Sequence, residues 1–392
     1  MKVVGVIAEY NPFHLGHAFH LAQARRLTGA DYVIAAMSGN YVQRGAPAMF
    51  DKFTRARAAL ENGADLVLEL PLSTAAGSAE YFASGAVSLL QHTGVVTDLC
   101  FGSECGELSL LEYPAKILAD EPFAYQELLK RRLKSGAPYP KARAEALRQY
   151  DSRISADILK EPNNLLGLEY LKAVRRSGGK IRPHTIRRIG SGYHGQQLHD
   201  THPASAGSIR RALLQSGGHF TPDICRQLPS AEIYASYQGK RPVTEDAFSL
   251  LLLEKLRRIQ GEPLSRYFDV TEELSNRIWN RLDDFFSFSQ FTDLLKTKNL
   301  TRTAVSRALL HILLNIREYR PAGTLRILGF RKDASALLKA VSERSSLPLV
   351  TNPAKAELPY EQLYADRLYE SVRSLLHGAV YQNEYRRKML VI

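Results

Sequence analysis

Five short apolar runs alternate with longer amphipathic stretches along the first half of the chain. Each run is short enough to be a buried strand, and helical periodicity separates the runs from one another. The runs are 3–8, 31–37, 65–70, 95–101 and 180–189. Strands that alternate with helices of about ten or more residues predict an α/β fold with a doubly wound parallel sheet.

The other segments show mainly helical periodicity. We expect one domain over residues 1–217, with a helical insertion at about 107–176, and a mainly helical, basic region over 218–392. In the second region, helices are predicted at 247–260, 272–287, 288–296 and 303–319. A small βαβ-like unit follows, with strands at 324–330 and 348–351 and a helix at 333–344.

Two histidines follow the first strand, at the start of the first predicted helix. Asn11 and Pro12 end the strand, and His14 and His17 then fall on one face of the helix. The first turn of a helix has unpaired N–H groups and a partial positive charge, which suit a phosphate chain. The imidazoles could donate hydrogen bonds as charge builds during attack at an α-phosphorus, and Gly16 would let the backbone approach the ligand. The alternatives are a structural pair or a metal pair, although no third ligand follows at motif spacing.

A second helix start, after the fifth strand, carries two hydroxyls, a glycine and an arginine. These residues are Ser205, Gly207, Ser208 and Arg210. Hydroxyls and a guanidinium at a helix N-terminus form a second nest for anions. Taken alone, the same pattern is also typical of an N-cap followed by an ordinary helix.

Three further features are expected at the carboxyl ends of strands, where parallel sheets bind ligands. The glycine-rich loop 38–47 is a candidate lid, and its Arg44 is either a phosphate or carboxylate clamp or an exposed charge. Gly102 ends the fourth strand, where a base or ribose could lie against the backbone. Asn163 and Asn164 open the helix before the fifth strand, and one of them is a natural N-cap.

The composition is that of a soluble globular protein, and its charge is uneven. The 392 residues are 45% hydrophobic and 23% charged, without a long apolar run or a signal peptide, so we expect a cytoplasmic protein that does not enter a membrane. The odd count of three cysteines fits a reducing compartment. The net charge is +12, whereas residues 1–100 carry a slight negative charge. The basic remainder predicts a polyanionic partner, and a merely basic soluble protein is the alternative.

Several segments carry a resemblance to a known family. Residues 14–17, His-Leu-Gly-His after a first strand, resemble the HxGH signature of the nucleotidyltransferase superfamily, which class I aminoacyl-tRNA synthetases share. Residues 205–210 resemble its second signature, ISSTxIR, from which the central Ala-Gly departs. The runs 5–13, 37–45 and 161–170 are similar to those of the bacterial tRNA(Met) cytidine acetate ligases. The resemblance is dense to about residue 215, and it implies a Rossmann-like sheet.

This resemblance implies an ATP-dependent acetate ligase. ATP and acetate would form acetyl-adenylate, and the acetyl group would pass to N4 of the wobble cytidine in the anticodon loop of elongator tRNA(Met). A carboxylate needs such activation because oxide is a poor leaving group, whereas AMP is a good one. The wobble base is unpaired and therefore accessible without opening a duplex. Mg²⁺ would bridge the phosphates of ATP, so no protein ligand for a metal is expected.

The resemblance also implies a set of site residues. The catalytic residues would be His14, His17, Ser208 and Arg210. The residues expected to bind ATP are Ile7, Ala8, Glu9, Tyr10, Asn11, Pro12, Phe13, His14, Leu15, Gly16, His17, His20, Gly102, Asn163, Asn164, Arg187, Arg188, Ser205, Ser208 and Arg210. Within the pair 163–164, the sequence leaves open which asparagine contacts ATP.

Two functions of other classes stay open. One is a nucleotidyltransferase that adenylylates a small phosphomonoester in cofactor synthesis, which would need little of the basic second region. The other is a non-enzymatic RNA-binding protein with a relict of this fold, against which the intact histidines argue. Acetate-dependent exchange of pyrophosphate into ATP would separate the ligase from the first alternative. For the second, His17→Ala should leave the cellular phenotype unchanged.

Two basic segments are candidate contacts for RNA. The run 130–134 is either a solvated helix face or a contact with the RNA backbone. A second group mixes positive charge with aromatic rings, as an unpaired RNA loop would need, and an ordinary charged surface is the alternative. Its members are Arg326, Arg331, Lys332, Arg386, Arg387 and Lys388, with Tyr381 and Tyr385.

Overall fold

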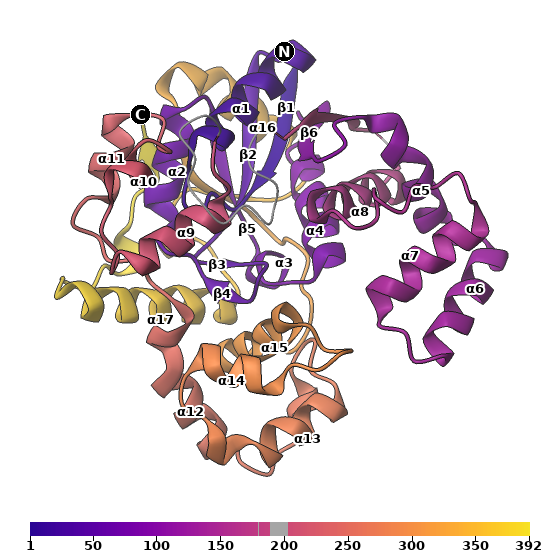
Figure 1. Cartoon of the computed structure of the whole chain (residues 1–392). Helices are drawn as coiled ribbons and strands as arrows, with labels where there is room; N and C mark the ends of the chain where they lie inside the picture. The colour runs from indigo at the N-terminus through magenta and orange to yellow at the C-terminus, as the bar shows by residue number, and fades with distance from the viewer. Residues whose placement is uncertain (179, 189–202) are drawn as a thin grey trace.

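One sheet organises the molecule, and it has eight strands among the residues that the structure describes (Figure 1). The computed structural model describes residues 1–178, 180–188 and 203–392. Neighbouring strands follow the order β10-β8-β5-β2-β1-β6-β7, and β9 pairs with β8 outside this path. The strands are β1 Val3–Ala8, β2 Tyr32–Ser38, β5 Leu66–Leu70, β6 Asp98–Ser103, β7 Arg182–Arg187, β8 Leu325–Phe330, β9 Leu349–Val350 and β10 Leu390–Val391.

The five strands predicted in the first half of the chain, β1, β2, β5, β6 and β7, form the parallel part of the sheet. β1 lies in the middle, where Val4 is in register with Val33 on one side and with Asp98 on the other. Helices cover both faces of such a strand, which is why residues 3–8 are a continuous apolar run. Residue 189, the predicted end of the fifth strand, lies outside the described residues, as does the run 190–194 that follows it.

The C-terminal region forms one edge of this same sheet. β8 pairs antiparallel with β5, and β9 and β10 each pair in parallel with β8. The small βαβ-like unit predicted within the helical region therefore extends the N-terminal sheet. Periodicity identifies such strands, but it carries no information on which strands pair.

Helices cover both faces of the sheet, and side chains alternate between the two cores. Val4, Val33 and Val67 face one core, whereas their neighbours Val3 and Ile34 face the other. The helices of the first face are α1 Leu15–Thr28, α2 Lys52–Glu61, α9 Ala206–Gln215, α10 Pro222–Cys225 and α11 Ala231–Tyr237. Those of the second face are α3 Leu72–Ala75, α4 Ala79–His92, α5 Leu108–Asp120, α8 Pro162–Arg176 and α16 Ser335–Arg344.

The insertion between β6 and β7 is helical, as the periodicity indicates. Between α5 and α8 it contains α6 Phe123–Lys134 and α7 Tyr139–Tyr150, which extend away from the sheet as a pair (Figure 1). The basic run 130–134 ends α6, where Lys130 lies 4.0 Å from Glu127 and Arg132 lies 3.5 Å from Glu145. These ion pairs favour the interpretation of this run as a solvated helix face.

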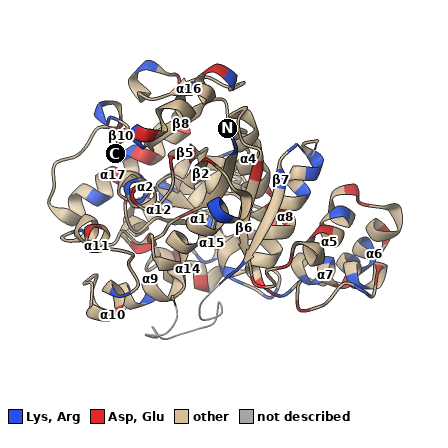
Figure 2. Cartoon of the chain, turned by 90° about the horizontal axis from the view of Figure 1, so that it is seen from above, with Lys and Arg blue, Asp and Glu red and all other residues tan. Residues whose placement is uncertain are grey.

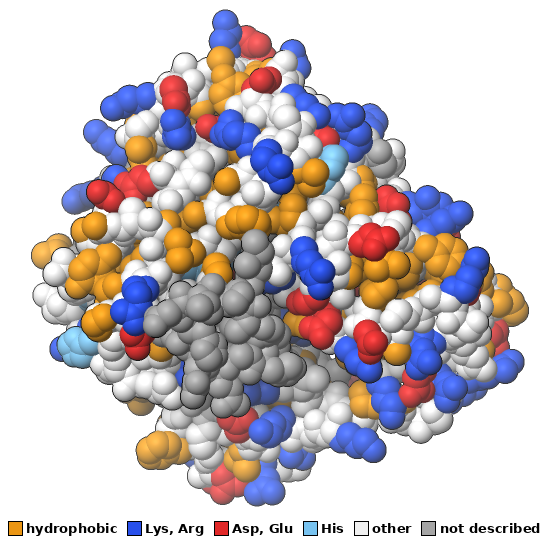
Figure 3. All heavy atoms as spheres, turned by 45° about the horizontal axis from the view of Figure 1, so that its top comes forward, with side chains coloured by type: hydrophobic (Ala, Val, Ile, Leu, Met, Phe, Trp, Pro, Cys, Tyr) orange, Lys and Arg blue, Asp and Glu red, His pale blue; other side chains and the backbone are white. Residues whose placement is uncertain are grey.

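The positive charge of the molecule is spread over its surface. Figure 2 shows basic and acidic residues side by side on α5, α6 and α7. On the face drawn in Figure 3, Lys and Arg side chains are scattered among acidic and apolar ones. The net charge therefore does not identify a surface that binds nucleic acid. Such a surface has to be identified from the local arrangement of its cations.

A third core lies within the C-terminal helices. Its helices are α12 Ser249–Arg258, α13 Glu272–Asn280, α14 Phe288–Leu295, α15 Arg302–Leu314 and α17 Tyr360–His377. Short 3₁₀ turns are η1 Glu245–Phe248, η2 Leu264–Arg266, η3 Leu282–Asp284, η4 Lys332–Ala334, η5 Pro353–Lys355 and η6 Glu384–Arg386. α15 ends before the predicted residue 319 because Asn315 adopts a left-handed φ of 58°. Among the described residues, no helix is long and apolar enough to cross a membrane.

The loop 38–47 is a packed hairpin, so its prediction as a lid is wrong. Its strands are β3 Tyr41–Val42 and β4 Ala46–Pro47. Tyr41, 1% exposed, donates its hydroxyl hydrogen to the carbonyl of Ala365 at 3.1 Å, and Asn40 Nδ2 donates to Asp366 at 2.9 Å. Gly45 lies directly against the backbone of α15. The glycine that suggested mobility instead permits close packing.

Candidate nucleotide-binding site

His14 and His17 cap the first turn of α1 reciprocally. Nδ1 of His14 accepts a hydrogen bond from the N–H of Gly16 at 3.0 Å, and Nδ1 of His17 accepts one from the N–H of His14 at 3.3 Å. The ring centroids lie 3.8 Å apart. A Cβ at Gly16 would lie 2.8 Å from Cε1 of His14. The glycine therefore makes room for the His14 ring and not, as predicted from the sequence, for a ligand.

Both imidazoles are neutral at physiological pH. Burial lowers the pKa of His14 to about 3, and the charges of Arg188 and Arg210 act in the same direction. Burial also holds the pKa of His17 well below its usual value, and so do the repulsion that a protonated His14 would exert and the charge of Arg188. A neutral ring whose Nδ1 accepts a hydrogen bond carries its proton on Nε2. Each histidine therefore keeps an Nε2–H donor, which is what a phosphate oxygen that gains negative charge requires.

The first turn of α9 meets the histidine turn. Ser205 is the N-cap, and its Oγ accepts a hydrogen bond from the N–H of Ser208 at 3.1 Å and lies 3.0 Å from the Ser208 hydroxyl. Arg210 Nη1 donates to the carbonyl of Asn11 at 2.7 Å, a contact between residues 199 positions apart. The structure thus brings the two predicted anion nests together beyond the carboxyl end of β1.

Arg188 and Gly102 lie at the β6–β7 side of the site. The N–H of Arg188 donates to the carbonyl of Ser103 at 3.0 Å. A Cβ at Gly102 would lie 3.1 Å from Cγ of Arg188, so the glycine leaves space for this side chain at the end of β6. Burial and then the charge of Arg188 lower the pKa of His20 to about 4. The side chain of Arg187 lies against Gly106 and not against Gly102.

The two asparagines at the start of α8 differ in their contacts. Asn164 is 2% exposed, and its Oδ1 accepts hydrogen bonds from the N–H groups of Glu104 at 3.0 Å and Cys105 at 3.1 Å. The Glu104 carboxylate accepts in return from the N–H groups of Asn163 at 3.2 Å and Asn164 at 2.7 Å. Asn164 therefore holds the loop after β6. Asn163 is half-buried, and its Nδ2 also donates to the Glu104 carboxylate, at 2.5 Å. Because more of Asn163 is exposed than of Asn164, it is the better placed of the two to contact a ligand.

Several residues predicted to bind ATP hold the loop after β1 in place. Asn11 Oδ1 accepts a hydrogen bond from the N–H of Met49 at 2.9 Å. The N–H of Phe13 donates to the hydroxyl of Tyr237 at 3.1 Å. Tyr10 is fully buried, with its ring centroid 5.0 Å from that of His17. These contacts fix the position of the histidine turn.

The remaining residues of this stretch are divided between the strand and the loop. They are Ile7, Ala8, Glu9, Pro12 and Leu15. Ile7 and Ala8 end β1, and Pro12 is buried in the loop. Glu9 Oε1 accepts a hydrogen bond from the N–H of Gln43 at 2.8 Å, and the N–H of Leu15 donates to the carbonyl of Gln227 at 2.9 Å. The supporting roles of Tyr237 and Gln227 could not be predicted from the sequence, because no local pattern connects these residues to the first strand.

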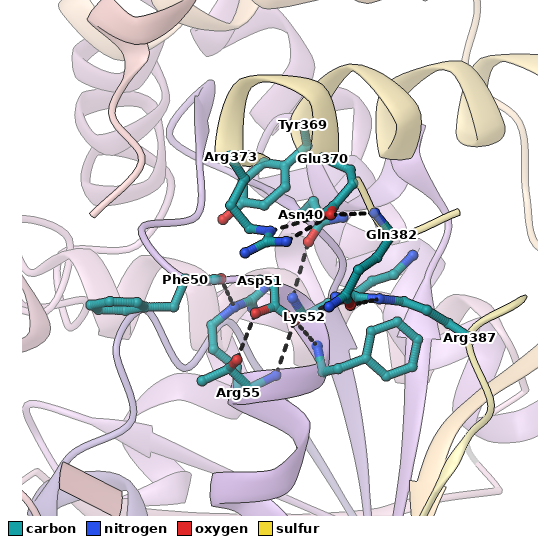
Figure 4. Close-up of polar contacts among 12 residues, drawn as sticks. Asn40, Phe50, Asp51, Lys52, Arg55, Tyr369, Glu370, Arg373, Gln382 and Arg387 are labelled. Atoms are coloured by element: carbon teal, nitrogen blue, oxygen red, sulfur yellow. Dashed lines mark hydrogen bonds and ion pairs between the residues drawn. The ribbon is translucent and has the colours of Figure 1, made fainter. Parts of the chain in front are cut away.

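Arg55 is a further support of the site that sequence reasoning missed. Its buried guanidinium donates to the carbonyls of Glu9 at 2.6 Å, Ser38 at 3.0 Å and Phe50 at 2.8 Å, and also to that of Gly39. It thereby joins the ends of β1 and β2 to the start of α2 (Figure 4). An arginine among the alanines of α2 is the only sign of this in the sequence.

Five charged side chains form a buried cluster between the sheet and the C-terminal region. Lys52 Nζ lies 2.9 Å from Glu69, 2.7 Å from Asp366 and 3.0 Å from Glu384. Arg326 pairs with the same three carboxylates. Because Arg326 is only 5% exposed, its prediction as a contact for an RNA loop is wrong. The pattern of 324–330 indicated a strand but not which side chains face inwards.

Comparison with known proteins covers nearly the whole chain. Residues 1–388 match the family model described as HIGH Nucleotidyl Transferase. The tRNA(Met) cytidine acetate ligase of Halothermothrix orenii is 40% identical over 369 residues, which span 90% of this chain and 87% of that protein. The chain belongs to the tRNA(Met) cytidine acetate ligase family. The corresponding protein of Acetivibrio thermocellus is 39% identical over 365 residues, or 89% of this chain and 88% of that one.

Two solved structures of this family have the same fold. The apo crystal structure of Thermotoga maritima TmcAL matches with a TM-score of 0.91 at 32% identity, over 100% of both chains. The structure of the same protein bound with alpha-thio ATP matches with a TM-score of 0.89. The predicted family, fold class and enzyme class, a ligase, are thereby confirmed.

Proposed function

We propose that this chain uses ATP to activate acetate as acetyl-adenylate and transfers the acetyl group to N4 of the wobble cytidine of elongator tRNA(Met). The observation that carries the proposal is the contact of Arg210 with Asn11, which joins the histidine turn to the first turn of α9. The relatives' name, tRNA(Met) cytidine acetate ligase, supports acetate and tRNA(Met) as substrates. The ATP analogue bound to the Thermotoga maritima relative supports ATP.

The triphosphate would span the two helix starts. In this arrangement the Nε2–H groups of His14 and His17 would donate to oxygens of the α-phosphate and of the leaving pyrophosphate. Ser205, Ser208 and Arg210 would hold the β- and γ-phosphates, with the N-terminus of α9 adding its partial positive charge. Neutral histidines suit this position, because a donor that keeps its proton stabilises charge without exchanging it.

The reaction would proceed in two displacements. An acetate oxygen attacks the α-phosphorus, the bond to the bridging oxygen breaks, and pyrophosphate leaves with the electron pair. N4 of cytidine then attacks the acetyl carbonyl, loses a proton, and AMP leaves. Mg²⁺ bound through the phosphates would neutralise part of their charge. Among the described residues, no group of three or more His, Cys, Asp or Glu side chains could hold a metal ion.

The adenosine would lie at the β6–β7 side of the site. There Arg188 supplies a cation beside Gly102, and Asn163 is half-buried at the start of α8. This placement follows the rule that ligands of open parallel sheets lie beyond the carboxyl ends of the strands. With the adenosine placed there, the α-phosphate would lie at the end of β1, beside the histidine turn.

Two assays on the same preparation test the proposal. The first measures exchange of labelled pyrophosphate into ATP, which should require acetate and should be lost in His17→Ala. The second measures the mass of nucleosides from tRNA(Met) incubated with the protein, ATP and acetate, and should find acetylated cytidine. Exchange that requires a small phosphomonoester in place of acetate would instead identify a cofactor-synthesising nucleotidyltransferase.

A further inference from the structure

An open groove lined by apolar and aromatic side chains lies where α10 meets α11. Its volume is about 530 Å³. Its lining residues are Phe220, Pro222, Cys225, Leu228, Ser230, Ala231 and Tyr234, and we call it the aromatic groove. The rings of Phe220 and Tyr234 meet at 66°, with centroids 5.8 Å apart, and both are half-buried. Each therefore keeps ring surface that another flat ring could cover.

The aromatic groove adjoins the histidine turn through a single ring. Phe220 stacks on Tyr237, with centroids 5.7 Å apart and an interplanar angle of 10°. The hydroxyl of Tyr237 accepts the hydrogen bond from the N–H of Phe13, the residue before His14. One buried ring thus connects the wall of the groove to the residue before His14.

Four cations from distant parts of the chain lie near one another around α2. They are Arg57, Lys240, Arg373 and Arg387, and we call them the cation group. Lys240 follows α11 and donates from Nζ to the hydroxyl of Thr54 on α2 at 2.6 Å. Figure 4 shows Arg373 of α17 and Arg387 of the C-terminal segment beside the start of α2.

Each arginine of the cation group pairs with a carboxylate, Arg57 with Glu61 at 3.6 Å, whereas Lys240 donates to a neutral hydroxyl. Glu370 pairs with Arg373 at 2.7 Å, and Asp51 pairs with Arg387 at 3.3 Å (Figure 4). Burial lowers the pKa of Lys240, and the charges of Arg373, Arg387 and Arg57 lower it further against the opposing effect of Asp51. The mutual repulsion of these four cations opposes folding, and a bound polyanion would reduce it.

We infer that the aromatic groove and the cation group together hold the RNA substrate, with an unpaired base against Phe220 and Tyr234 and phosphates at Lys240 and Arg387. This inference rests on the proposed function, and it assigns the surface on which the RNA lies. An aromatic platform beside cations is the arrangement by which proteins bind single-stranded nucleic acid, because bases stack while cations follow the backbone. The base would be one that flanks the reacting cytidine.

The test measures the affinity of the full-length protein for a tRNA(Met) transcript over a series of salt concentrations. Lys240→Gln should weaken binding and reduce the slope of log K against log salt by about 0.7 to 0.9 for each phosphate that the variant no longer neutralises. Lys339→Gln on α16, where the side chain is 78% exposed, is the matched control and should change neither quantity. Lys240→Arg keeps the positive charge, so its affinity for the transcript and its salt slope should equal those of the wild type.

The base contact has its own variants. Tyr234→Ala should weaken binding about 5-fold to 100-fold without changing the salt slope, and Tyr234→Phe should retain the affinity. In every variant, acetate-dependent pyrophosphate exchange should equal that of the wild type, because neither residue touches the ATP site. Loss of exchange together with RNA binding would overturn the inference, since these side chains would then support the active site instead.

The outcomes separate this inference from the proposed function. A wild-type protein that acetylates the transcript while Lys240→Gln and Tyr234→Ala bind it normally would overturn the inference alone. A wild-type protein that exchanges pyrophosphate with acetate but neither binds nor acetylates the transcript would overturn both the RNA half of the proposed function and the inference. Equal loss of affinity for a duplex RNA of the same length in Tyr234→Ala would overturn the assignment of the groove to an unpaired base.

Discussion

At the scale of single residues, the site depends on side chains held in one protonation state and one orientation. His14 and His17 each accept a backbone hydrogen bond on Nδ1, and burial keeps both rings neutral. The sequence identified these histidines, because His-x-Gly-His after a strand is a narrow pattern. It could not assign Asn163 and Asn164 separately, because both stand at the start of one helix and only the fold of the β6 loop distinguishes them.

Substituting Asn163 and Asn164 one at a time should distinguish a role in stability from a role in ATP binding. Asn164→Ala leaves the buried N–H groups of Glu104 and Cys105 without an acceptor, so the free energy of unfolding should fall by about 1–3 kcal/mol. Asn163→Ala removes one half-exposed hydrogen bond to Glu104, so it should lower the unfolding free energy by less, about 0.5–1.5 kcal/mol, and raise the KM for ATP. Urea denaturation and pyrophosphate exchange measure the two effects. Equal destabilisation by both variants would contradict the assignment.

The buried histidines should make the protein sensitive to acid. The pKa of His20 is about 4 in the folded chain and about 6.5 in an unfolded one, so between these values only the unfolded state takes up the proton. Stability from this residue is therefore complete above pH 6.5 and falls as pH decreases towards 4. From pH 6.5 to pH 5 the loss is about 2 kcal/mol.

His20→Gln should remove this part of the acid sensitivity. Denaturant titrations at pH 7 and pH 5 should show a smaller difference in unfolding free energy for the variant than for the wild type. His219→Gln replaces an exposed histidine and serves as the control. An unchanged difference in His20→Gln would show that His20 titrates alike in both states.

At the scale of elements, the strands of the parallel sheet and most helices were predictable, and their contacts were not. The continuous apolar runs gave β1, β2 and β5 nearly to the residue, because strands covered on both faces need such runs. The hairpin β3–β4 was mistaken for a lid, because glycine and polar residues are typical both of mobile loops and of tightly packed turns. Its packing partners, α15 and α17, lie more than two hundred residues away in sequence.

Alanine in place of Gly45 tests the docking of this hairpin. Gly45 has φ +77°, and a Cβ there would overlap the backbone of Ser306 and Arg307. Gly45→Ala should lower the unfolding free energy by at least about 3 kcal/mol, combining left-handed strain with overpacking. Gly29→Ala is the matched control, because Gly29 has φ +61° with open space around it, and should lose only about 1 kcal/mol. Similar thermal shifts in both variants would contradict the packing.

At the scale of the whole molecule, the C-terminal region completes the structure that the N-terminal region begins. β8 covers the edge of β5, and the buried cluster of Lys52, Glu69, Arg326, Asp366 and Glu384 joins the two regions through charge. Composition predicted that the second region was basic, and periodicity predicted its strands. Neither could reveal that it shares the sheet, because pairing is a property of the folded chain.

Removal of the central cation of this cluster should destabilise the whole protein. Lys52→Met leaves three buried carboxylates with Arg326 as their remaining partner within the cluster, and an uncompensated buried charge costs about 3–5 kcal/mol. Lys339→Met removes an exposed lysine and should change stability by less than about 0.5 kcal/mol. Calorimetry of both variants measures the difference. A single transition that stays within about 1 °C of the wild type in Lys52→Met would contradict a structural role for the cluster.

The antiparallel pairing of β8 with β5 has a consequence for synthesis of the protein. A ribosome makes Leu70 about 250 residues before it makes Leu325, so the nascent chain carries the unpaired backbone edge of β5 for most of its translation. Lys52 and Glu69 also lack their C-terminal ion-pair partners, Asp366, Glu384 and Arg326, during this part of translation. The sheet of the N-terminal region is therefore completed only when translation is almost finished. A premature stop before β8 would release a fragment in which the edge of β5 is exposed and prone to aggregation.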